Sequence, residues 1–449
     1  MTPGSRRRAS LLAVMTRAKK SRRPRAAKTA SGAAKSAPTN EVKPRERPDP
    51  TKIDAERALD HLMQLLALPG ASGREGQVAD YVRRALLAAG VAESAIGHDQ
   101  AHRALQRSGR DFEVGNLIAR IPGRGPLRKA PRLLFMGHMD TVPLCRGAVP
   151  KRAVVDGQDR IVPQGETALG GDNRTSIGAL ITLVETLAAS DAPHPPLTIL
   201  CTVGEEIGLL GAKQVQAKRL GQPAMGFNVD SGQPAAVTIG AVGADRFSIA
   251  VHGKSSHAGV HPEHGVSAVL IASRAIADVA EKGYFGKIDF GDRKIGTSNI
   301  GVIQGGETTN QVTDLVRLRG ESRSHHRAFL GRITREIRTS FEQAARSVSN
   351  HRGESGRVEF DAARDYDSFR MPKSSPPVRR SLEAAKRLGL ASELRVANGG
   401  LDANILNGLG IPTVTLGAGQ HNPHTVDEYV DVQEYLDGCR LLVAIATGG

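Results

Sequence analysis

The chain has 449 residues, of which 39% are hydrophobic and 24% are charged, and these values are typical of a soluble globular protein with two or three domains. No apolar run approaches the ~18 residues that a membrane helix needs, so a membrane-spanning protein is excluded and no membrane partner is expected. The formal charge of +15 is uneven: residues 1–50 hold 14 Lys and Arg against 3 acidic residues, which leaves +4 for the other 399 residues.

The basic N-terminal segment, residues 1–50, is rich in Ala, Ser, Pro, Lys and Arg and is predicted to be a disordered tail. Such a tail alone would bind nucleic acid without regard to sequence. The chain has no Trp and only 3% aromatic residues, so platforms for base stacking are not expected and no specific nucleic-acid partner is predicted. A transit peptide and a start codon assigned too far upstream, with Met15 or a later site as the true start, both remain open.

Three cysteines, Cys145, Cys201 and Cys439, are scattered along the chain. An odd and scattered set argues against a disulfide framework and favours a reducing compartment. We therefore expect a cytoplasmic protein.

From residue 51 onward the sequence alternates between helix and strand patterns. Apolar residues at helical spacing form two runs within 53–90, and the sequence LPGASG separates them. Apolar runs of strand type follow at 115–121, 132–140, 197–206 and 225–232, with a long helix pattern at 172–190. After residue 372, a helix, a strand and a closing helix are predicted at 381–390, 411–417 and 433–446. This order predicts an α/β fold with a mixed, mostly parallel sheet and helices on both faces.

The pattern changes near residue 242. Strand, helix, two strands, helix and strand are predicted in turn at 245–256, 267–282, 297–306, 308–324, 327–349 and 356–369. This βαββαβ order is that of a ferredoxin-like α+β domain. We expect residues 242–368 to form an inserted lid or dimerisation domain, and residues 51–241 and 369–449 to form the catalytic domain.

Charged and imidazole side chains follow the ends of the predicted strands. These residues are His138 and Asp140, Glu205 and Glu206, Asp230 and, after the last strand, His424; Asp172 precedes the long helix. Taken singly, each has an ordinary role, such as a core imidazole, a helix cap, a turn residue or a solvated glutamate pair. Ligands of open α/β sheets bind beyond the carboxyl ends of the strands, so these side chains are expected to converge there.

Many carboxylates at one sheet edge favour a metal site, because like charges would otherwise repel one another. Imidazole with carboxylate suits zinc, cobalt or manganese, and no cysteine is among the candidates, which argues against a closed structural zinc site. The donors exceed what one ion requires, whereas a two-metal site bridged by one carboxylate would use them. A spare carboxylate beside such a pair can act as a general base.

Five motifs in the chain resemble those of a known family. The motifs LLFMGHMDTVP, GGDNRTSIGAL, TVGEEIGLLGAK, NVDSG and NPHTVDEYV are similar to those of the two-zinc aminopeptidases and acylamino hydrolases that include peptidase T, the bacterial glutamate carboxypeptidases and the aminoacylases. The resemblance runs from about residue 51 to the C-terminus. It is greatest to the peptidase T branch, through GGLDANILNGLGIPTVTLGAGQHNPHTVDEY.

The resemblance implies a role for each site residue. His138 and Asp230 would bind one of two Zn²⁺ ions per subunit, and Glu206 and His424 would bind the other. Asp172 would bridge the ions, Glu205 would be the general base, and Asp140 would orient the imidazole of His138. On the lid, His257 would polarise the scissile carbonyl, sometimes from the partner subunit of a homodimer, and Asn310 and Arg323 would bind substrate. For His257 a surface imidazole, and for Arg323 a lid-surface salt bridge, are the alternative interpretations.

The resulting hypothesis is a cytoplasmic metallopeptidase of the peptidase T type, an aminopeptidase acting on tripeptides, that cleaves an amide bond through a water activated by two metals. Its substrate would be a short peptide or an acylated amino acid. One alternative is a deacylase or carboxypeptidase that acts on N-acyl amino acids. A second is a non-enzymatic binding protein that uses the basic tail.

Overall fold

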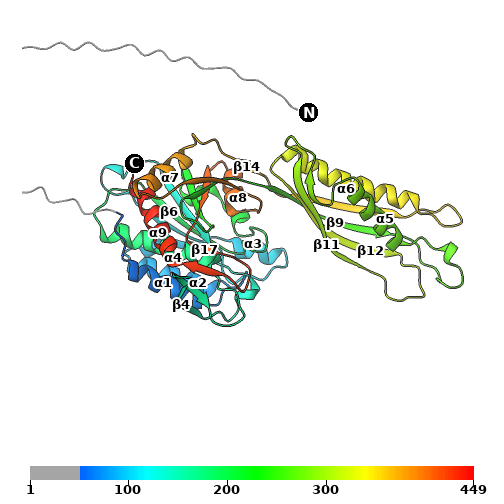
Figure 1. Ribbon diagram of the computed structural model, residues 1–449, viewed down its shortest axis with the longest axis horizontal. Helices are drawn as coiled ribbons and strands as arrows, with labels where there is room; N and C mark the ends of the chain where they lie inside the picture. The colour runs from blue at the N-terminus through cyan, green and yellow to red at the C-terminus, as the bar shows by residue number, and fades with distance from the viewer. Residues whose placement is uncertain (1–50, 449) are drawn as a thin grey trace, which may run out of the picture. The chain divides into compact units, whose positions relative to one another are not determined.

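Among residues 51–448, the largest of the sheets contains nine strands in the order β1-β2-β6-β3-β7-β16-β8-β14, with β15 also paired to β8. Figure 1 labels two of these strands, β6 and β14. The structure, a computed structural model, describes residues 51–448, and the predicted basic tail at 1–50 lies outside them. The strands of this sheet are β1 (Ile96–His98), β2 (Leu117–Ile121), β3 (Leu133–His138), β6 (Leu197–Thr202), β7 (Met225–Val229), β8 (Ala236–Ala241), β14 (Phe369–Arg370), β15 (Glu393–Ala397) and β16 (Thr413–Leu416).

The centre of this sheet is parallel. Strand β3 pairs in parallel with β6 and with β7, and β16 pairs in parallel with β7. Antiparallel pairs occur toward the edges, where β2 joins β6 and β14 joins β8. Every residue of β3 and β6 is buried, because both faces of a central parallel strand are covered. The predicted mixed, mostly parallel sheet is therefore confirmed.

Helices pack around the nine-stranded sheet. They are α1 (Ala55–Ala67), α2 (Gly76–Ala88), α3 (Ala101–Arg107), α4 (Gly171–Ala189), α7 (Pro376–Arg387), α8 (Asp402–Gly408) and α9 (Val432–Thr447). Phe135 of β3 packs in one apolar cluster with residues of α1, α2, α4, α7 and α9. Its neighbours Leu134 and Met136 pack in another, with Leu406 of α8. Successive side chains of a strand point to opposite faces, so both faces of the sheet are covered, as predicted.

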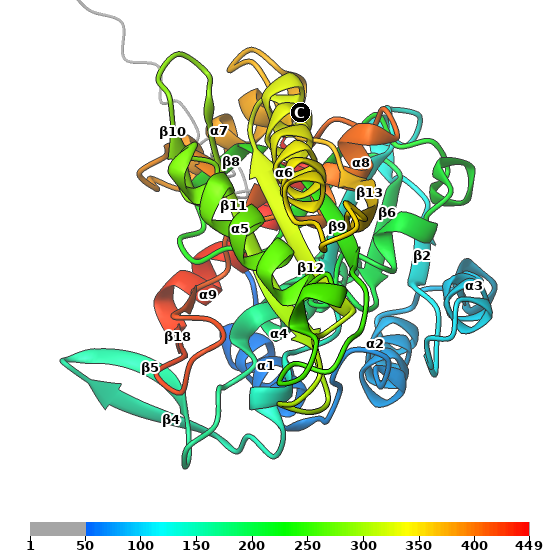
Figure 2. The same ribbon diagram turned by 90° about the vertical axis from the view of Figure 1, so that its right-hand side faces the viewer.

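A second sheet contains four short strands in the order β17-β18-β5-β4. They are β4 (Pro150–Val155), β5 (Gln158–Pro163), β17 (Gln420–His421) and β18 (Tyr429–Asp431). Figure 2 shows β4 and β5 as a hairpin, which turns at Asp156 and Gly157, both with positive φ. The small sheet matters for the site because the segment between β17 and β18 carries His424.

The third sheet has five antiparallel strands in the order β10-β11-β12-β9-β13. Its strands are β9 (Gly243–His252), β10 (Gly286–Asp289), β11 (Ile295–Gly305), β12 (Leu315–Ser324) and β13 (Arg357–Tyr366), and its helices are α5 (Ala268–Glu281) and α6 (Arg327–Ser347). Both helices share an apolar cluster with β9 and β12 and overlie the sheet in Figure 2.

Apart from the short edge strand β10, this third sheet has the order β11-β12-β9-β13, and the elements run βαββαβ along the chain. The ferredoxin-like arrangement expected for the lid is therefore confirmed. The proposed domain boundaries themselves stay a prediction. In the described range 51–448, no helix combines the length and the low charge that crossing a bilayer would require.

Candidate metal centre

The predicted donors leave the sheet at one edge. Strand β3 ends at His138, β6 is followed by Glu205 and Glu206, and β7 is followed directly by Asp230. Gly137 allows this assembly, because a Cβ there would lie 2.1 Å from Oγ of Ser176 on α4. The sequence therefore brings α4, with Asp172 in its first turn, close to the end of β3.

Asp172 lies between the two predicted histidine ligands. Its Oδ1 is 3.1 Å from Nε2 of His138, and its Oδ2 is 3.6 Å from Nε2 of His424. One carboxylate thus presents a different oxygen to each imidazole, which is the arrangement expected of a ligand that bridges two ions.

Each histidine also faces one further carboxylate. Nε2 of His138 is 3.8 Å from Oδ1 of Asp230, and Nε2 of His424 is 3.0 Å from the carboxylate of Glu206. The donor atoms of His138, Asp172 and Glu206 all lie within 4.8 Å of one another. The structure brings together the five side chains that sequence reasoning named as ligands, in the pairs that the resemblance implied.

Asp140 contacts His138 and the backbone of the two glutamates. Its Oδ1 lies 3.4 Å from Nδ1 of His138 and accepts a hydrogen bond from the backbone N–H of Glu205 at 3.0 Å. Its Oδ2 accepts hydrogen bonds from the backbone N–H of Glu206 and from Oγ of Ser72. Burial raises the pKa of Asp140, but the hydrogen bond and charge of His138 outweigh burial and lower that pKa. Asp140 therefore favours the tautomer that leaves Nε2 of His138 free for a metal.

Glu205 differs from its neighbour Glu206. Within residues 51–448, its carboxylate makes no hydrogen bond and no ion pair, although its backbone is held by Asp140. Burial raises the pKa of Glu205 well above its ordinary value; His138 opposes this rise, and Asp230 adds to it. A half-buried carboxylate that is free of partners beside the ligand group has the properties of a general base.

The charges of the site fit a pair of cations. Burial raises the pKa of Glu206 and of Asp230, and the neighbouring Asp172 raises both further. For His138, burial lowers the pKa, but the neighbouring carboxylates of Asp140, Asp172 and Asp230 raise it well above its ordinary value. Without a counter-charge these carboxylates therefore resist ionisation, and divalent ions would relieve their repulsion. Imidazole and carboxylate donors suit zinc, cobalt and manganese alike.

Three buried acids that sequence reasoning missed support the centre. Glu428 accepts hydrogen bonds from the backbone N–H groups of Leu169 and Gly170, both at 2.8 Å, and of Asp172 at 2.9 Å. It thereby fixes the backbone that carries Asp172, the predicted bridging ligand. Glu428 lies within the family motif NPHTVDEYV, so the sequence did mark its position. The sequence could not show that its side chain is buried, with an exposed fraction of 1%.

The other two buried acids are Glu75 and Asp402. Oε1 of Glu75 accepts a hydrogen bond from the N–H of Gly204, the residue before Glu205, and burial raises the pKa of Glu75 to about 7. Asp402, at the start of α8, accepts a hydrogen bond from Oγ1 of Thr202 at the end of β6, and burial raises its pKa to about 7 as well. Both acids therefore hold segments next to the predicted ligands. Neither follows the end of a predicted strand, so the sequence did not identify them.

The three predicted lid residues lie apart from this group. His257 and Asn310 belong to neighbouring segments, because the N–H of Ala258 donates to the carbonyl of Asn310 at 2.9 Å. Arg323 of β12 pairs with Glu321 through Nε at 2.7 Å, which is the lid-surface salt bridge considered above as its alternative role. In the described part of the chain, none of the three side chains is bonded to a member of the metal centre, so their roles stay predictions.

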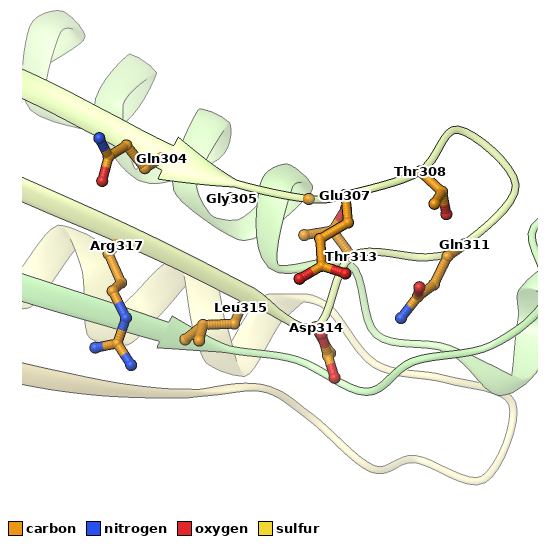
Figure 3. A pocket seen from close by; sticks show the side chains of 10 residues that line it. Gln304, Gly305, Glu307, Thr308, Gln311, Thr313, Asp314, Leu315 and Arg317 are labelled. Atoms are coloured by element: carbon orange, nitrogen blue, oxygen red, sulfur yellow. The ribbon is translucent and has the colours of Figure 1, made fainter.

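A cavity of ≈ 370 Å³ lies on the lid near Asn310, where Gln304, Glu307, Gln311 and Arg317 border it (Figure 3). No predicted ligand lines it, and its residues come from the ends of β11 and β12 and the loop between them. This cavity is therefore separate from the metal centre.

Comparison with known proteins gives a consistent result. Residues 134–448 match the model of the family described as peptidase family M20/M25/M40. An uncharacterised protein, YqjE of Bacillus subtilis strain 168, is 30% identical over 396 residues, which is 88% of this chain and 98% of YqjE.

Two solved structures are similar along most of their length. The crystal structure of aminopeptidase PepT from Bacillus cereus ATCC 10987 is 30% identical with a TM-score of 0.74, over 88% of this chain and 98% of that one. The crystal structure of a tripeptidase, SAV1512, from Staphylococcus aureus is 28% identical with a TM-score of 0.76, over the same shares of the two chains.

Proposed function

The chain belongs to peptidase family M20/M25/M40, and on that basis we propose that it is a dinuclear metal-dependent aminopeptidase that cleaves tripeptides. The similarity to structures named an aminopeptidase PepT and a tripeptidase supports this choice of substrate. The observation that carries the proposal is the position of Asp172 between His138 and His424, with the unpartnered carboxylate of Glu205 beside them.

The residues would hold two ions as two sets that share Asp172. His138 and Asp230 form one set, and Glu206 and His424 form the other. Bound divalent ions lower the pKa of water and polarise a carbonyl. We propose zinc ahead of cobalt and manganese because the sequence motifs of the site resemble those of two-zinc peptidases.

The protein side chains would then manage the proton and the substrate. Glu205 accepts the proton of the attacking water and returns it to the leaving amine, which its unpartnered carboxylate and its raised pKa favour. His257 is proposed to stabilise the oxyanion and, with Asn310, lies on neighbouring lid segments. Arg323 is proposed to bind the terminal carboxylate of the substrate, for which it would exchange its present partner Glu321.

We further propose a homodimer formed through the lid. Strand β10 pairs with β11 only up to Ser298, so the outer edge of β11 from Ile300 to Gly305 has no strand partner among the described residues, and Ile303 on it is 56% exposed. An open strand edge can pair with a second copy. Sedimentation of the full chain tests this proposal, and a monomer at micromolar concentration contradicts it.

The cytoplasm remains our proposed compartment. Cys145, Cys201 and Cys439 are free thiols, and Cys201 and Cys439 are buried. Thiols that remain reduced are usual in a reducing compartment. Fractionation of the source cells, with detection of the intact protein, tests this assignment, and recovery outside the cytoplasm would overturn it.

The adjacent glutamates provide the test of the mechanism. Glu205→Gln keeps the shape of the side chain but removes the base, so we expect kcat on a tripeptide to fall by about 10²- to 10⁴-fold with the metal content unchanged. Glu206→Gln is the matched control, since it removes a ligand and is expected to lower metal content as well as activity. Full activity of the Glu205→Gln variant would contradict the assignment of Glu205 as the general base.

A substrate panel separates the proposal from its alternative. The panel contains tripeptides with free N-termini, the same peptides with blocked N-termini, and N-acyl amino acids, each tested with zinc, cobalt and manganese. We expect turnover of the free tripeptides. Hydrolysis of the N-acyl amino acids alone would instead identify a deacylase or carboxypeptidase.

A further inference from the structure

A second group of metal-binding side chains lies on the lid, apart from the metal centre. It consists of His261, Glu263 and His264, which we call the lid histidine cluster. The sequence HPEHG places all three within four residues, and the short 3₁₀ turn Pro262–His264 folds them together. No residue of the cluster takes part in the proposed peptidase reaction.

The distances within the cluster are those of ligands around one ion. Oε1 of Glu263 is 3.1 Å from Nδ1 of His261 and 3.6 Å from Nε2 of His264. One donor atom from each of the three side chains lies within 4.8 Å of the others. Ligand atoms about 2.1 Å from a tetrahedral ion lie about 3.4 Å from one another, so little movement would be required.

His351, in a neighbouring turn, contacts two residues of the cluster. The ring of His264 stacks on that of His261, with centroids 4.7 Å apart, and contacts the tilted ring of His351, with centroids 4.5 Å apart. Both the backbone N–H and Nδ1 of His351 lie 3.0 Å from the carbonyl oxygen of Glu263. These contacts orient two of the ligand residues before any ion binds, as supporting residues do in known metal sites.

The charge of the cluster favours a cation. Its hydrogen bonds, first from its own backbone N–H and then from His261, lower the pKa of Glu263, so this carboxylate is ionised at neutral pH. The side chains of His261, Glu263 and His264 are 59%, 52% and 45% exposed, which leaves the donors open to an ion from solution.

We propose that the lid histidine cluster binds a third divalent transition-metal ion, of the zinc, nickel or copper class that imidazole and carboxylate donors prefer. Three protein ligands leave a further position of the ion open to water. The site lies one turn from the predicted substrate contact His257, because the N–H of His261 donates to the carbonyl of His257 at 3.0 Å. Binding would therefore hold the loop that carries His257, a consequence that rests on the proposed function, whereas the site itself does not.

Zinc titration of the tag-free, metal-stripped full chain tests the proposal through stoichiometry. We expect three zinc ions per wild-type chain at micromolar free zinc, and two in the double variant His261→Ala/His264→Ala. The matched control is His252→Ala, which removes a lid histidine that faces one carboxylate, Glu359 at 3.4 Å. Among residues 51–448, His252 belongs to no cluster of three donors. This control is expected to bind three.

A second variant shows whether a loss of zinc binding comes from the lid histidine cluster or from the metal centre. In His138→Ala/His424→Ala, which removes a ligand from each set of the metal centre, we expect one tight zinc ion to remain, to raise the Tm, and to disappear on adding His264→Ala. Equal stoichiometry of the wild type and the His261→Ala/His264→Ala variant would overturn the lid site, whatever the metal centre binds. Loss of all zinc from His138→Ala/His424→Ala would overturn it too.

Discussion

Glu428 shows how much of the centre depends on a residue that binds no metal in our assignment. Its carboxylate is buried and occupied by three backbone N–H groups, of Leu169, Gly170 and Asp172. A backbone amide at the end of a helix or in a loop needs an acceptor when water is excluded, and a carboxylate with two oxygens can accept all three. The backbone position of Asp172, the proposed bridging ligand, is therefore set by Glu428.

Glu428→Gln should weaken metal binding. The substitution replaces one acceptor oxygen with an NH₂ group that faces a backbone N–H, so the first turn of α4 must shift. We expect metal affinity and kcat/KM to fall by about 10- to 100-fold, as for other residues that orient ligands. Metal retained after dialysis is the measurement, and Asp427→Asn, an exposed neighbouring acid, is the control. Wild-type metal content in Glu428→Gln would show that Asp172 does not depend on it.

Among single residues, the donors and the supporting Asp140 were readable from the sequence, and the other supporting acids were not. His138, Glu206 and Asp230 follow apolar runs, and a run of that kind identifies both a buried strand and the residue at its end. Asp402 and Glu75 do not follow an apolar run of this kind. Their importance comes from burial beside the centre, which depends on α8 and on the loop before α2 folding back onto the strand ends.

Helix packing determines how closely α4 and α9 approach. Gly178 of α4 faces Tyr435 of α9, and a Cβ at Gly178 would lie 2.5 Å from Oη of Tyr435. That hydroxyl is buried and donates a hydrogen bond to the carbonyl of Ala58 on α1 at 3.0 Å. Three helices thus meet at one glycine, and α4 is the helix that carries Asp172 at its start.

Gly178→Ala should therefore destabilise the protein. The added methyl group has no room unless Tyr435 moves, and overpacking of this kind costs about 1–3 kcal/mol. Urea unfolding measures the change. The matched control is Gly331→Ala on α6, where the nearest atom to the new Cβ is Nη1 of Arg335 at 3.4 Å, so the helix propensity of alanine should stabilise by up to about 1 kcal/mol. Equal stability of Gly178→Ala and the wild type would contradict this packing.

Most long elements were predictable because their apolar periodicity reflects burial, and short ones were not. The prediction missed several short strands of two to six residues, two helices of seven residues and the hairpin of β4 and β5. The missed strands are β1, β8, β10, β14, β15, β17 and β18, and the missed helices are α3 and α8. That hairpin did carry a signal, since Asp156–Gly157 between two alternating segments is a favoured two-residue turn. The others lack enough length for periodicity to separate strand from loop.

At the scale of the whole molecule, the positive charge and the proposed chemistry occupy different parts of the chain. Residues 1–50 contribute 11 of the +15 charges, whereas every proposed metal ligand and the proposed base lie beyond residue 130. The βαββαβ order of the lid was also readable at this scale, because it depends only on the sequence of element types. The use of the lid in catalysis was not, since that depends on contacts with a substrate.

Removal of residues 1–50 should leave peptidase activity unchanged. The remaining chain keeps all proposed ligands, the base and the lid, so we expect the same kcat/KM for a tripeptide at physiological salt. Steady-state kinetics of the full and shortened chains provide the comparison. Loss of activity on truncation would favour the alternative in which the basic tail carries the function.

In our proposal, two metal ions at one centre make this chain a peptidase. Tripeptide hydrolysis tests this when zinc is added stepwise to metal-stripped protein that carries His264→Ala, which removes the lid site. We expect no activity without metal, then a rise that levels off at two equivalents per chain. Activity that survives metal removal, or that levels off at one equivalent, would contradict it.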